Sequence, residues 1–338
     1  MNIRDIAKMA GVTHTTVSKI LNDKGNISQE TKKKVISIMK KYNYFPSDAA
    51  RRTSLGRGGE IAFISTKYAS PYISRVIEGA EDRSHGMGKY SNKLTIYSTR
   101  GTQELKKEIL SKIARGKLAD AVIMLFVTPP ADILRLYRKN GIPVILLEAE
   151  MKGTHSIVVD NVSGAYDAAS YLAGIGRKKI GFIRGETGFE EVGPTPAERE
   201  KGYRKGLAAA GIGFDRNLLE EVRAYSFEEG RRSLDKLLSR EKKLDAIFCA
   251  AGDLCALGVM ERAKELGVRI PADLAVIGFD DIMAASQVRP ALATVRQPVY
   301  EMGIKAFETA VDAAERRIKK PINISIKPEI IIRESAGS

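Results

Sequence analysis

The stretch VTHTTVSKILNDKGNISQETKKKV, residues 12–35, places a polar and basic helical segment close to the amino terminus. Thr13 can cap a helix over Thr13–Asn22, and Ser28 can cap another that ends before Pro46. Residues 23–26, DKGN, have the composition of a turn between them. The expected buried positions are Val17, Ile20 and Leu21 in the first of these helices and Val35, Ile38, Met39 and Tyr42 in the second.

A further helix is expected ahead of this stretch, where Asn2 can act as a cap and Gly11 breaks the pattern. Its apolar face consists of Ile3, Ile6, Ala7 and Ala10. Two short helices separated by a tight glycine turn, the second polar on its outer face, are typical of a helix-turn-helix motif. The sequence therefore predicts a small all-α head at the start of the chain.

Positive charge is concentrated in the same region. The chain of 338 residues has a net charge of +14, and residues 1–59 hold twelve Lys and Arg against four Asp and Glu, or +8. This concentration favours a module that binds a polyanion such as nucleic acid, although a lysine-rich helix can also be a solvated surface.

The remainder of the chain has the pattern of an α/β protein. After SDAARRTSLGRGG, residues 47–59, which resembles a linker or a short helix, brief apolar runs alternate with amphipathic helical stretches. Such runs indicate parallel strands buried on both faces, and eight of them predict two doubly wound sheets. The runs are 61–65, 94–98, 121–125, 143–147, 156–160, 179–183, 246–250 and 275–279.

Several classes of protein are disfavoured by what the sequence lacks. Cys249 and Cys255 fit a reducing cytoplasm and are expected to be buried. No signal peptide and no stretch of about 18 apolar residues is found, so neither secretion nor a membrane span is expected. GxGxxG fails at Lys179, no P-loop or GxSxG is complete, and the three histidines are scattered, so we expect no enzyme, cofactor or metal site.

Four segments together resemble the lactose/galactose repressor (LacI/GalR) family along nearly the whole chain. They are IRDIAKMAGVTHTTVSKILN continuing to YNYFPSDAAR (3–51), VVDNVSGAYDAASYLAGIGRKKIGFIRG (158–185), AEREKGYRKGLAAAGI (197–212) and VIGFDDIMAASQVRPALATVRQP (276–298). The resemblance implies a DNA-binding head, a hinge and two subdomains of periplasmic-binding-protein type. The expected boundaries are 1–46 for the head, 47–59 for the hinge, 60–157 with 291–320 for the N-terminal subdomain, and 158–290 with 321–335 for the C-terminal one.

The resemblance implies that the second helix lies in the major groove of DNA, with His14, Thr15 and Lys19 at base edges. Lysine can donate to guanine O6 and N7. All three side chains are expected on the exposed side of the helix, opposite its apolar face. His14 could instead be an ordinary exposed residue. Candidates for phosphate contacts or helix caps are Thr13, Thr16 and Ser18, and Asn22 and Arg51 complete the expected DNA-binding set.

The hinge departs from the family pattern. Thr53 stands where the family places a leucine that wedges into the minor groove, and Leu55 follows two residues later. Either Leu55 replaces that leucine through a shifted helix, or the operator is bent less. A flexible linker is the third possibility.

Similar proteins close two subdomains around a small effector, and the resemblance carries this role to three residues at predicted strand ends and to three residues in other segments. The candidates are Tyr72, Phe126, Glu148, Arg199, Tyr225 and Asp280. Carboxylates and an arginine can hold vicinal hydroxyls while aromatic faces stack on a sugar ring, so a carbohydrate is the expected ligand.

Two positions differ from the sugar-binding pattern, because Gly252 and Leu125 stand where amide or polar side chains are common. The pocket is therefore expected to be roomier and more apolar, and to accept a larger, phosphorylated or non-sugar ligand. Arg199 could alternatively pair with Glu198 or Glu200 on a helix surface, and Asp253 is expected to cap a helix over 253–266.

The sequence thus predicts a cytoplasmic transcriptional regulator, most simply a repressor, that binds a pseudo-palindromic double-stranded operator as a homodimer under allosteric control by a small molecule. Two alternatives remain. A solute-binding receptor would need a signal peptide, and a cytoplasmic sugar-binding or sugar-processing α/β protein would leave the basic head unexplained.

Overall fold

The computed structural model describes residues 3–21, 25–42, 58–188 and 193–337. The chain divides into two compact units, Met1–Gly58 and Gly59–Ser338, which we describe separately as the head and the effector unit. Asn2, the turn residues 22–24 and nearly all of the expected hinge lie outside the described residues.

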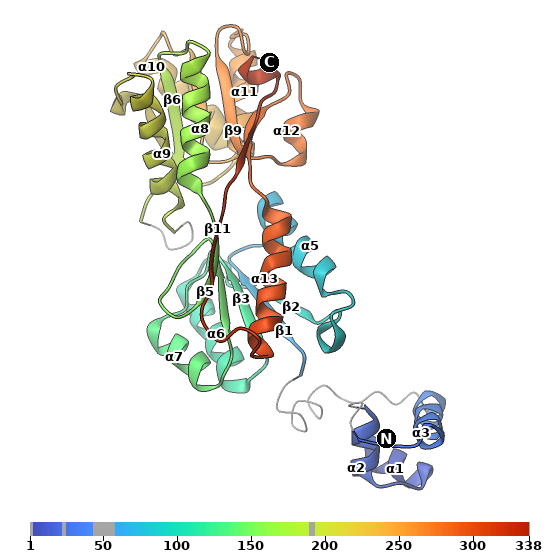
Figure 1. The fold of residues 1–338 in the computed structure, drawn as a ribbon. Coiled ribbons are helices and arrows are strands. Elements are labelled where there is room, and N and C mark those ends of the chain that lie inside the picture. The colour runs from blue at the N-terminus through green and yellow to red at the C-terminus, as the bar shows by residue number, and fades with distance from the viewer. Residues whose placement is uncertain (1–2, 22–24, 43–57, 189–192, 338) are drawn as a thin grey trace. The chain divides into compact units, whose positions relative to one another are not determined.

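The described part of the head contains helices α1 (Ile3–Ala10), α2 (His14–Leu21) and α3 (Gln29–Lys41) (Figure 1). Ser28 caps α3 by accepting a hydrogen bond from the Thr31 amide, as predicted. Tyr42 is wrongly assigned to the buried stripe, because it follows the last turn of α3 and is 44% exposed. The fully buried core is Ile6, Ala7, Ala10, Val17, Ile20 and Val35.

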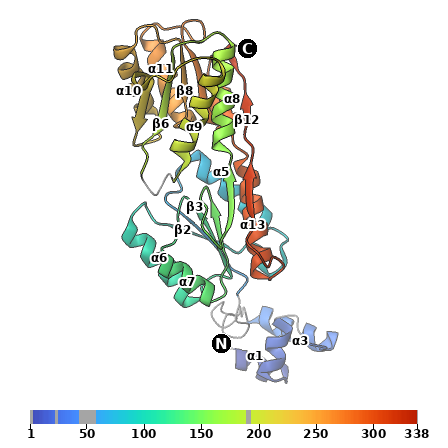
Figure 2. The same ribbon diagram turned by 60° about the vertical axis from the view of Figure 1, so that its left-hand side comes forward.

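The effector unit contains two six-stranded sheets among its described residues (Figures 1 and 2). The first sheet has the order β11-β5-β4-β3-β1-β2 and is parallel throughout. Its strands are β1 (Ile61–Ser65), β2 (Leu94–Ser98), β3 (Ala121–Leu125), β4 (Val144–Leu147), β5 (His155–Val159) and β11 (Asn323–Ile326). Helices α5 (Pro71–Ser84) and α13 (Val299–Ala314) cover one face, and α6 (Gln103–Gly116) and α7 (Ala131–Lys139) cover the other.

The second sheet has the order β12-β10-β9-β8-β6-β7. Strand β12 runs antiparallel to β10, and the other neighbouring strands pair in parallel. Its strands are β6 (Ile180–Gly185), β7 (Leu219–Val222), β8 (Ala246–Cys249), β9 (Ala275–Asp280), β10 (Ala293–Arg296) and β12 (Glu329–Ile331). Helices α8 (Asn161–Gly174) and α9 (Thr195–Ala209) pack on one face, and α10 (Phe227–Arg240), α11 (Asp253–Glu265) and α12 (Met283–Gln287) on the other. The two doubly wound sheets confirm the predicted fold class.

The chain crosses between the sheets later than the sequence suggested. The expected changes at 157/158, 290/291 and 320/321 are wrong, because β5 continues to Val159, β10 pairs with β9, and β11 pairs with β5. The eight apolar runs all form strands. The four strands that the sequence reading missed, β7, β10, β11 and β12, are short or carry polar residues.

Helices α5 and α13 form a close pair on one face of the first sheet. A Cβ atom added to Gly303 of α13 would lie 2.0 Å from the Val76 carbonyl oxygen of α5, and one on Gly79 would lie 2.1 Å from the Tyr300 carbonyl oxygen. Glycine is therefore required for the approach of these two backbones.

Cys249 and Cys255 are both buried and free, as expected. No helix among the described residues has the length and apolar character to span a membrane.

Candidate functional site

The outer face of α2 carries the candidate base-reading residues. His14, Thr15 and Lys19 are exposed, while Val17 and Ile20 of the same helix are buried against α1 and α3. This arrangement follows from the helical spacing of the apolar positions. The three polar side chains are therefore free of the head's core and available to a partner molecule.

The threonines before and within α2 organise its amino terminus. The Thr16 amide donates to Thr13 Oγ1 at 3.2 Å, which makes Thr13 the predicted cap. The hydroxyls of Thr15 and Thr16 lie 3.1 and 2.9 Å from the same oxygen. Ser18 is half-buried on the same helix. The candidates Asn22, Arg51, Thr53 and Leu55 lie outside the described residues.

In the effector unit, the six candidate ligand-binding residues come from separate elements. Tyr72 opens α5, Phe126 directly follows β3, Glu148 follows β4 and Asp280 ends β9. Phe126, Glu148 and Asp280 have positive φ angles of 54°, 58° and 120°. Residues other than glycine rarely have positive φ angles. Those that do cluster at functional sites, where the backbone turns sharply and presents their side chains.

Glu148 lies at the centre of this group. Its carboxylate accepts hydrogen bonds from Tyr72 Oη and from the Val159 amide, both at 3.2 Å. Burial raises the pKa of Glu148 to about 7, although Arg199 and these hydrogen bonds oppose the rise. The Tyr72 ring packs against Phe126 with centroids 5.6 Å apart, which supplies an aromatic surface beside the carboxylate.

Arg199 is buried and forms no surface ion pair with Glu198 or Glu200, the alternative that the sequence allows. Its Nε donates to Asn161 Oδ1 at 2.8 Å, and its Nη1 donates to the Ala250 carbonyl at 2.7 Å. The guanidinium lies 3.6 Å from the centre of the Phe279 ring. Glu200 instead pairs with Arg184 at 2.7 Å.

Asp280 is held close to Arg199 and Gln297. Gln297 Nε2 donates to Asp280 Oδ1 at 2.6 Å, and burial raises the pKa of Asp280 to about 6 against the opposing effect of Arg199. Arg199 and Asp280 also influence the raised pKa of Tyr225 in opposite directions. The structure therefore brings five of the candidates, Tyr72, Glu148, Arg199, Tyr225 and Asp280, into one electrostatically linked group, and Phe126 adjoins this group by packing on Tyr72.

A cavity of about 450 Å³ adjoins this group. Its lining contains two of the six candidates, Phe126 and Glu148, and several residues that the sequence reading did not select. The others are Thr128, Ala149, Glu150, Val158, Gly193, Pro194, Thr195 and Glu198. The volume lies within the range of small-molecule sites, about 300–1,000 Å³.

Asn161 is the most informative residue that was missed. Besides accepting from Arg199, its Nδ2 donates to Glu198 Oε2 and to the Val159 carbonyl, each at 3.3 Å. It follows strand β5 as Glu148 follows β4. The rule that ligands gather at the carboxyl ends of parallel strands could have identified it.

Two expectations about departures from the family pattern need correction. Leu125, the last residue of β3, is fully buried in the core of the first sheet, so its side chain is no part of the cavity. Asp253 does not cap α11, because its buried carboxylate accepts from Thr294 Oγ1 at 2.6 Å and from the Ile282 amide at 2.9 Å. Gly252 is the actual cap residue, with a φ of +99°, and an added Cβ would lie 2.8 Å from Asp280 Oδ2.

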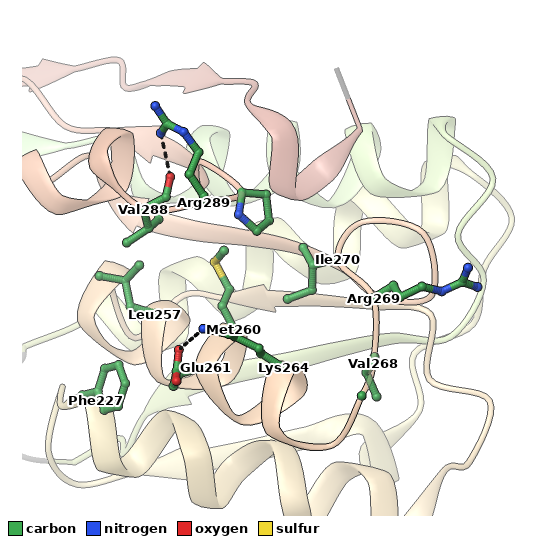
Figure 3. A pocket seen from close by; sticks show the side chains of 12 residues that line it. Phe227, Leu257, Met260, Glu261, Lys264, Val268, Arg269, Ile270, Val288 and Arg289 are labelled. Carbon is green, nitrogen blue, oxygen red and sulfur yellow. Dashed lines mark hydrogen bonds and ion pairs between the residues drawn. The ribbon is translucent and has the colours of Figure 1, made fainter.

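A second cavity of about 560 Å³ lies along α11 and the loop that follows it (Figure 3). Phe227, Leu257, Met260, Val268, Ile270 and Val288 give it an apolar floor, with Glu261, Lys264, Arg269 and Arg289 around it. None of the six ligand-binding candidates lines it. We call this feature the α11 groove.

No group of three or more His, Cys, Asp or Glu side chains suited to a metal ion occurs within the described ranges.

Comparisons with known proteins agree with this architecture. A model described as bacterial regulatory proteins of the lacI family matches residues 2–47, and one described as a periplasmic binding protein-like domain matches residues 169–336. The chain is 30% identical over 342 residues to the HTH-type transcriptional regulator DegA of Bacillus subtilis, covering 99% of this chain and 98% of that protein. Identity and coverage are the same for the HTH-type transcriptional repressor PurR of Haemophilus influenzae.

Solved structures share the fold at lower identity. A Lac repressor dimer bound to operator and the anti-inducer ONPF aligns with a TM-score of 0.85 at 21% identity, covering 99% of this chain and 98% of that one. A complex of the transcriptional regulator CelR with cellobiose aligns with a TM-score of 0.72 at 23% identity, covering 99% of both chains.

Proposed function

Because the chain belongs to the LacI family of bacterial transcriptional regulators, we propose that its head binds a pseudo-palindromic operator and that a small molecule in the effector unit alters this binding. The protein is a DNA-binding regulator and not an enzyme. We propose that it acts as a repressor, as its relative PurR does, and that it is cytoplasmic because it contacts DNA.

The exposed face of α2 is the proposed reading surface. We assign base contacts to His14, Thr15 and Lys19, and phosphate contacts to Thr13, Thr16 and Ser18. The positive charge of the head supplies attraction to the phosphate backbone that does not depend on base sequence. Asn22, Arg51, and either Thr53 or Leu55 complete the proposed DNA contacts.

The linked group around Glu148, Arg199 and Asp280 is the single observation that carries the effector assignment. Glu148 follows a strand of the first sheet, whereas Asp280 and Arg199 belong to the second sheet and to a helix packed on it, so a ligand that binds all three favours one relative placement of the two sheets. Tyr72, Phe126 and Tyr225 supply aromatic surface for a carbohydrate-like ligand. By linkage, the effector and the operator must change each other's affinity by the same factor.

We propose a homodimer with the α11 groove as part of its contact. The groove is apolar, and Leu254 and Leu266 at the two ends of α11 are 37% and 44% exposed. A Lac repressor of the same fold is described as a dimer on its operator. Two heads in one dimer would match two half-sites of a pseudo-palindromic operator.

Selection from random duplexes tests the proposal directly. The full chain should enrich a two-fold symmetric sequence, and its affinity should fall steeply as salt is raised because counterions are released on binding. Sedimentation of wild type and Leu257→Lys should show a dimer and a monomer, respectively. A protein that enriches no duplex at low or high salt would lack the proposed function.

A further inference from the structure

The 450 Å³ cavity is acidic. Its ionisable lining residues are Glu148, Glu150 and Glu198, and no Lys, Arg or His belongs to the described lining. Polyol ligands need acceptors as well as donors, but three carboxylates around one small cavity offer acceptors almost alone. This composition selects for a ligand that supplies hydrogen-bond donors.

A second, independent feature marks the cavity as a binding site. Thr195 lines it and is only 7% exposed, and its hydroxyl has no hydrogen-bond partner within the described part of the chain. Buried hydroxyls are normally satisfied, since leaving one unpaired costs free energy. A bound ligand atom would provide the missing partner.

The nearby positive charge is already committed. Arg199 is the cation that influences both Glu148 and Glu198, and it donates to Asn161 and to the Ala250 carbonyl. Around Glu198 the other charged groups are Glu150 and Asp160, which repel it. Burial raises the pKa of Glu148 and of Glu198, as expected for carboxylates that lack enough positive charge.

The start of α9 does not offset this acidity. A helix amino terminus often binds anions through its free amides. Here Pro194 and Pro196 have no N–H, the Glu198 amide is bonded to the Pro194 carbonyl, and the Glu198 side chain itself occupies the first turn. A phosphate group would therefore meet three carboxylates and few donors.

We infer that the effector carries a protonated amino group among hydroxyl groups, as an amino sugar does, and that this group binds between Glu148, Glu150 and Glu198 while a neighbouring hydroxyl pairs with Thr195. This inference rests on the proposed effector site and narrows its ligand. It excludes the phosphorylated ligands that the sequence left open.

Ion pairing with the ligand has a measurable consequence for protons. The ammonium group favours the charged forms of Glu148 and Glu198, so protons leave these carboxyls as the ligand binds. Arg199, Asn161, Tyr72, Asp160 and Glu150 are the other polar groups that act on the two carboxyls. Ligand affinity should therefore rise between pH 5 and pH 7, with proton release visible by calorimetry in buffers of different ionisation enthalpy.

The experiment compares matched sugars on the full chain at pH 7. Glucosamine, galactosamine and mannosamine are each titrated beside the parent hexose, the N-acetyl derivative and the hexose 6-phosphate. At least one amino sugar should bind about tenfold more tightly than its neutral counterparts, as a charge-assisted pair in a buried site implies, and the phosphates should not bind. Glu198→Gln should remove that preference, whereas Glu108→Gln, at an exposed position of α6, should keep it.

Operator binding by the wild type is measured alongside. If the protein binds its operator but prefers a neutral or phosphorylated sugar, or none of the three amino sugars, the inference is wrong and the proposed function stands. If it binds no duplex at all, the proposed function fails whatever the sugars do.

Discussion

The reading helix of the head and the cavity of the effector unit place their functional groups in opposite environments. On α2, His14, Thr15 and Lys19 are exposed and follow one another in a single helix. In the effector unit, Glu148 and Arg199 are buried and lie far apart in sequence. A surface for DNA can be written locally, whereas a site for a small molecule has to be assembled by tertiary packing.

The largest effect is expected where the effector unit depends on close packing between distant segments. Gly303→Ala would place a methyl group 2.0 Å from the Val76 carbonyl oxygen, so we expect a loss of about 3 kcal/mol in stability, measured by denaturant unfolding. Gly174→Ala is the matched control, because no heavy atom lies within 4 Å of its added Cβ. Equal stability of the two variants would contradict this account of the α5–α13 contact.

A smaller effect is expected from the buried carboxyls. The pKa values of Glu148 and Asp280, about 7 and about 6, lie above their ordinary values, so the folded state holds protons that the unfolded state releases. The stability they contribute is present below about pH 4 and is lost as pH rises through 6 to 7. Between pH 5 and pH 8 the effector unit should lose about 2–4 kcal/mol, measured by urea unfolding.

The double variant Glu148→Gln, Asp280→Asn should remove most of this slope, and Glu198, whose pKa burial also raises, should retain its smaller share. His155, whose pKa is lowered by burial, contributes an opposite slope to both proteins and cancels in the comparison. Glu265→Gln is the control, because its pKa of about 2 lies outside the window. A double variant with the full wild-type slope would mean that other groups cause it.

The DNA surface should respond in specificity rather than in stability. The double variant Thr15→Ala, Lys19→Ala should lose about 30-fold or more in preference for the selected operator over a scrambled duplex, since each good base contact is worth about 1–3 kcal/mol. Gel-shift titration of both duplexes measures this. Lys40→Ala removes an exposed charge from α3 and should weaken both duplexes alike. An unchanged preference in the double variant would move the reading surface elsewhere.

The smallest effect concerns the cap of the reading helix. Thr13→Ala removes the acceptor for the Thr16 amide and should cost α2 about 1 kcal/mol, while Thr13→Ser should retain the cap. Hydrogen exchange of the α2 amides in the full chain would report the difference as about a fivefold loss of protection. Similar protection in the two variants would show that the cap contributes nothing.

The candidate site was predictable in part. Glu148, Phe126 and Asp280 were found because each ends an apolar strand run, and Arg199 because a motif carried it. Asn161 follows β5, and Gln297 follows β10. The sequence does not predict β10, because ATVR is short and ends in an exposed arginine. Nothing in the sequence singles out Thr195 or Glu198. Only packing leaves the Thr195 hydroxyl unpaired and buries the Glu198 carboxylate with too little positive charge nearby.

The sequence by itself determined the helices of the head, the caps Thr13 and Ser28, the eight principal strands and the two-sheet class, since these follow from residue spacing and from side chains within a few positions. Only the tertiary structure decided where the chain crosses between sheets, which partner Arg199 and Asp253 have, and how acidic the cavity is. These properties depend on groups far apart in sequence, and burial, which sets the cost of each unpaired charge or hydroxyl, exists only once the segments have packed.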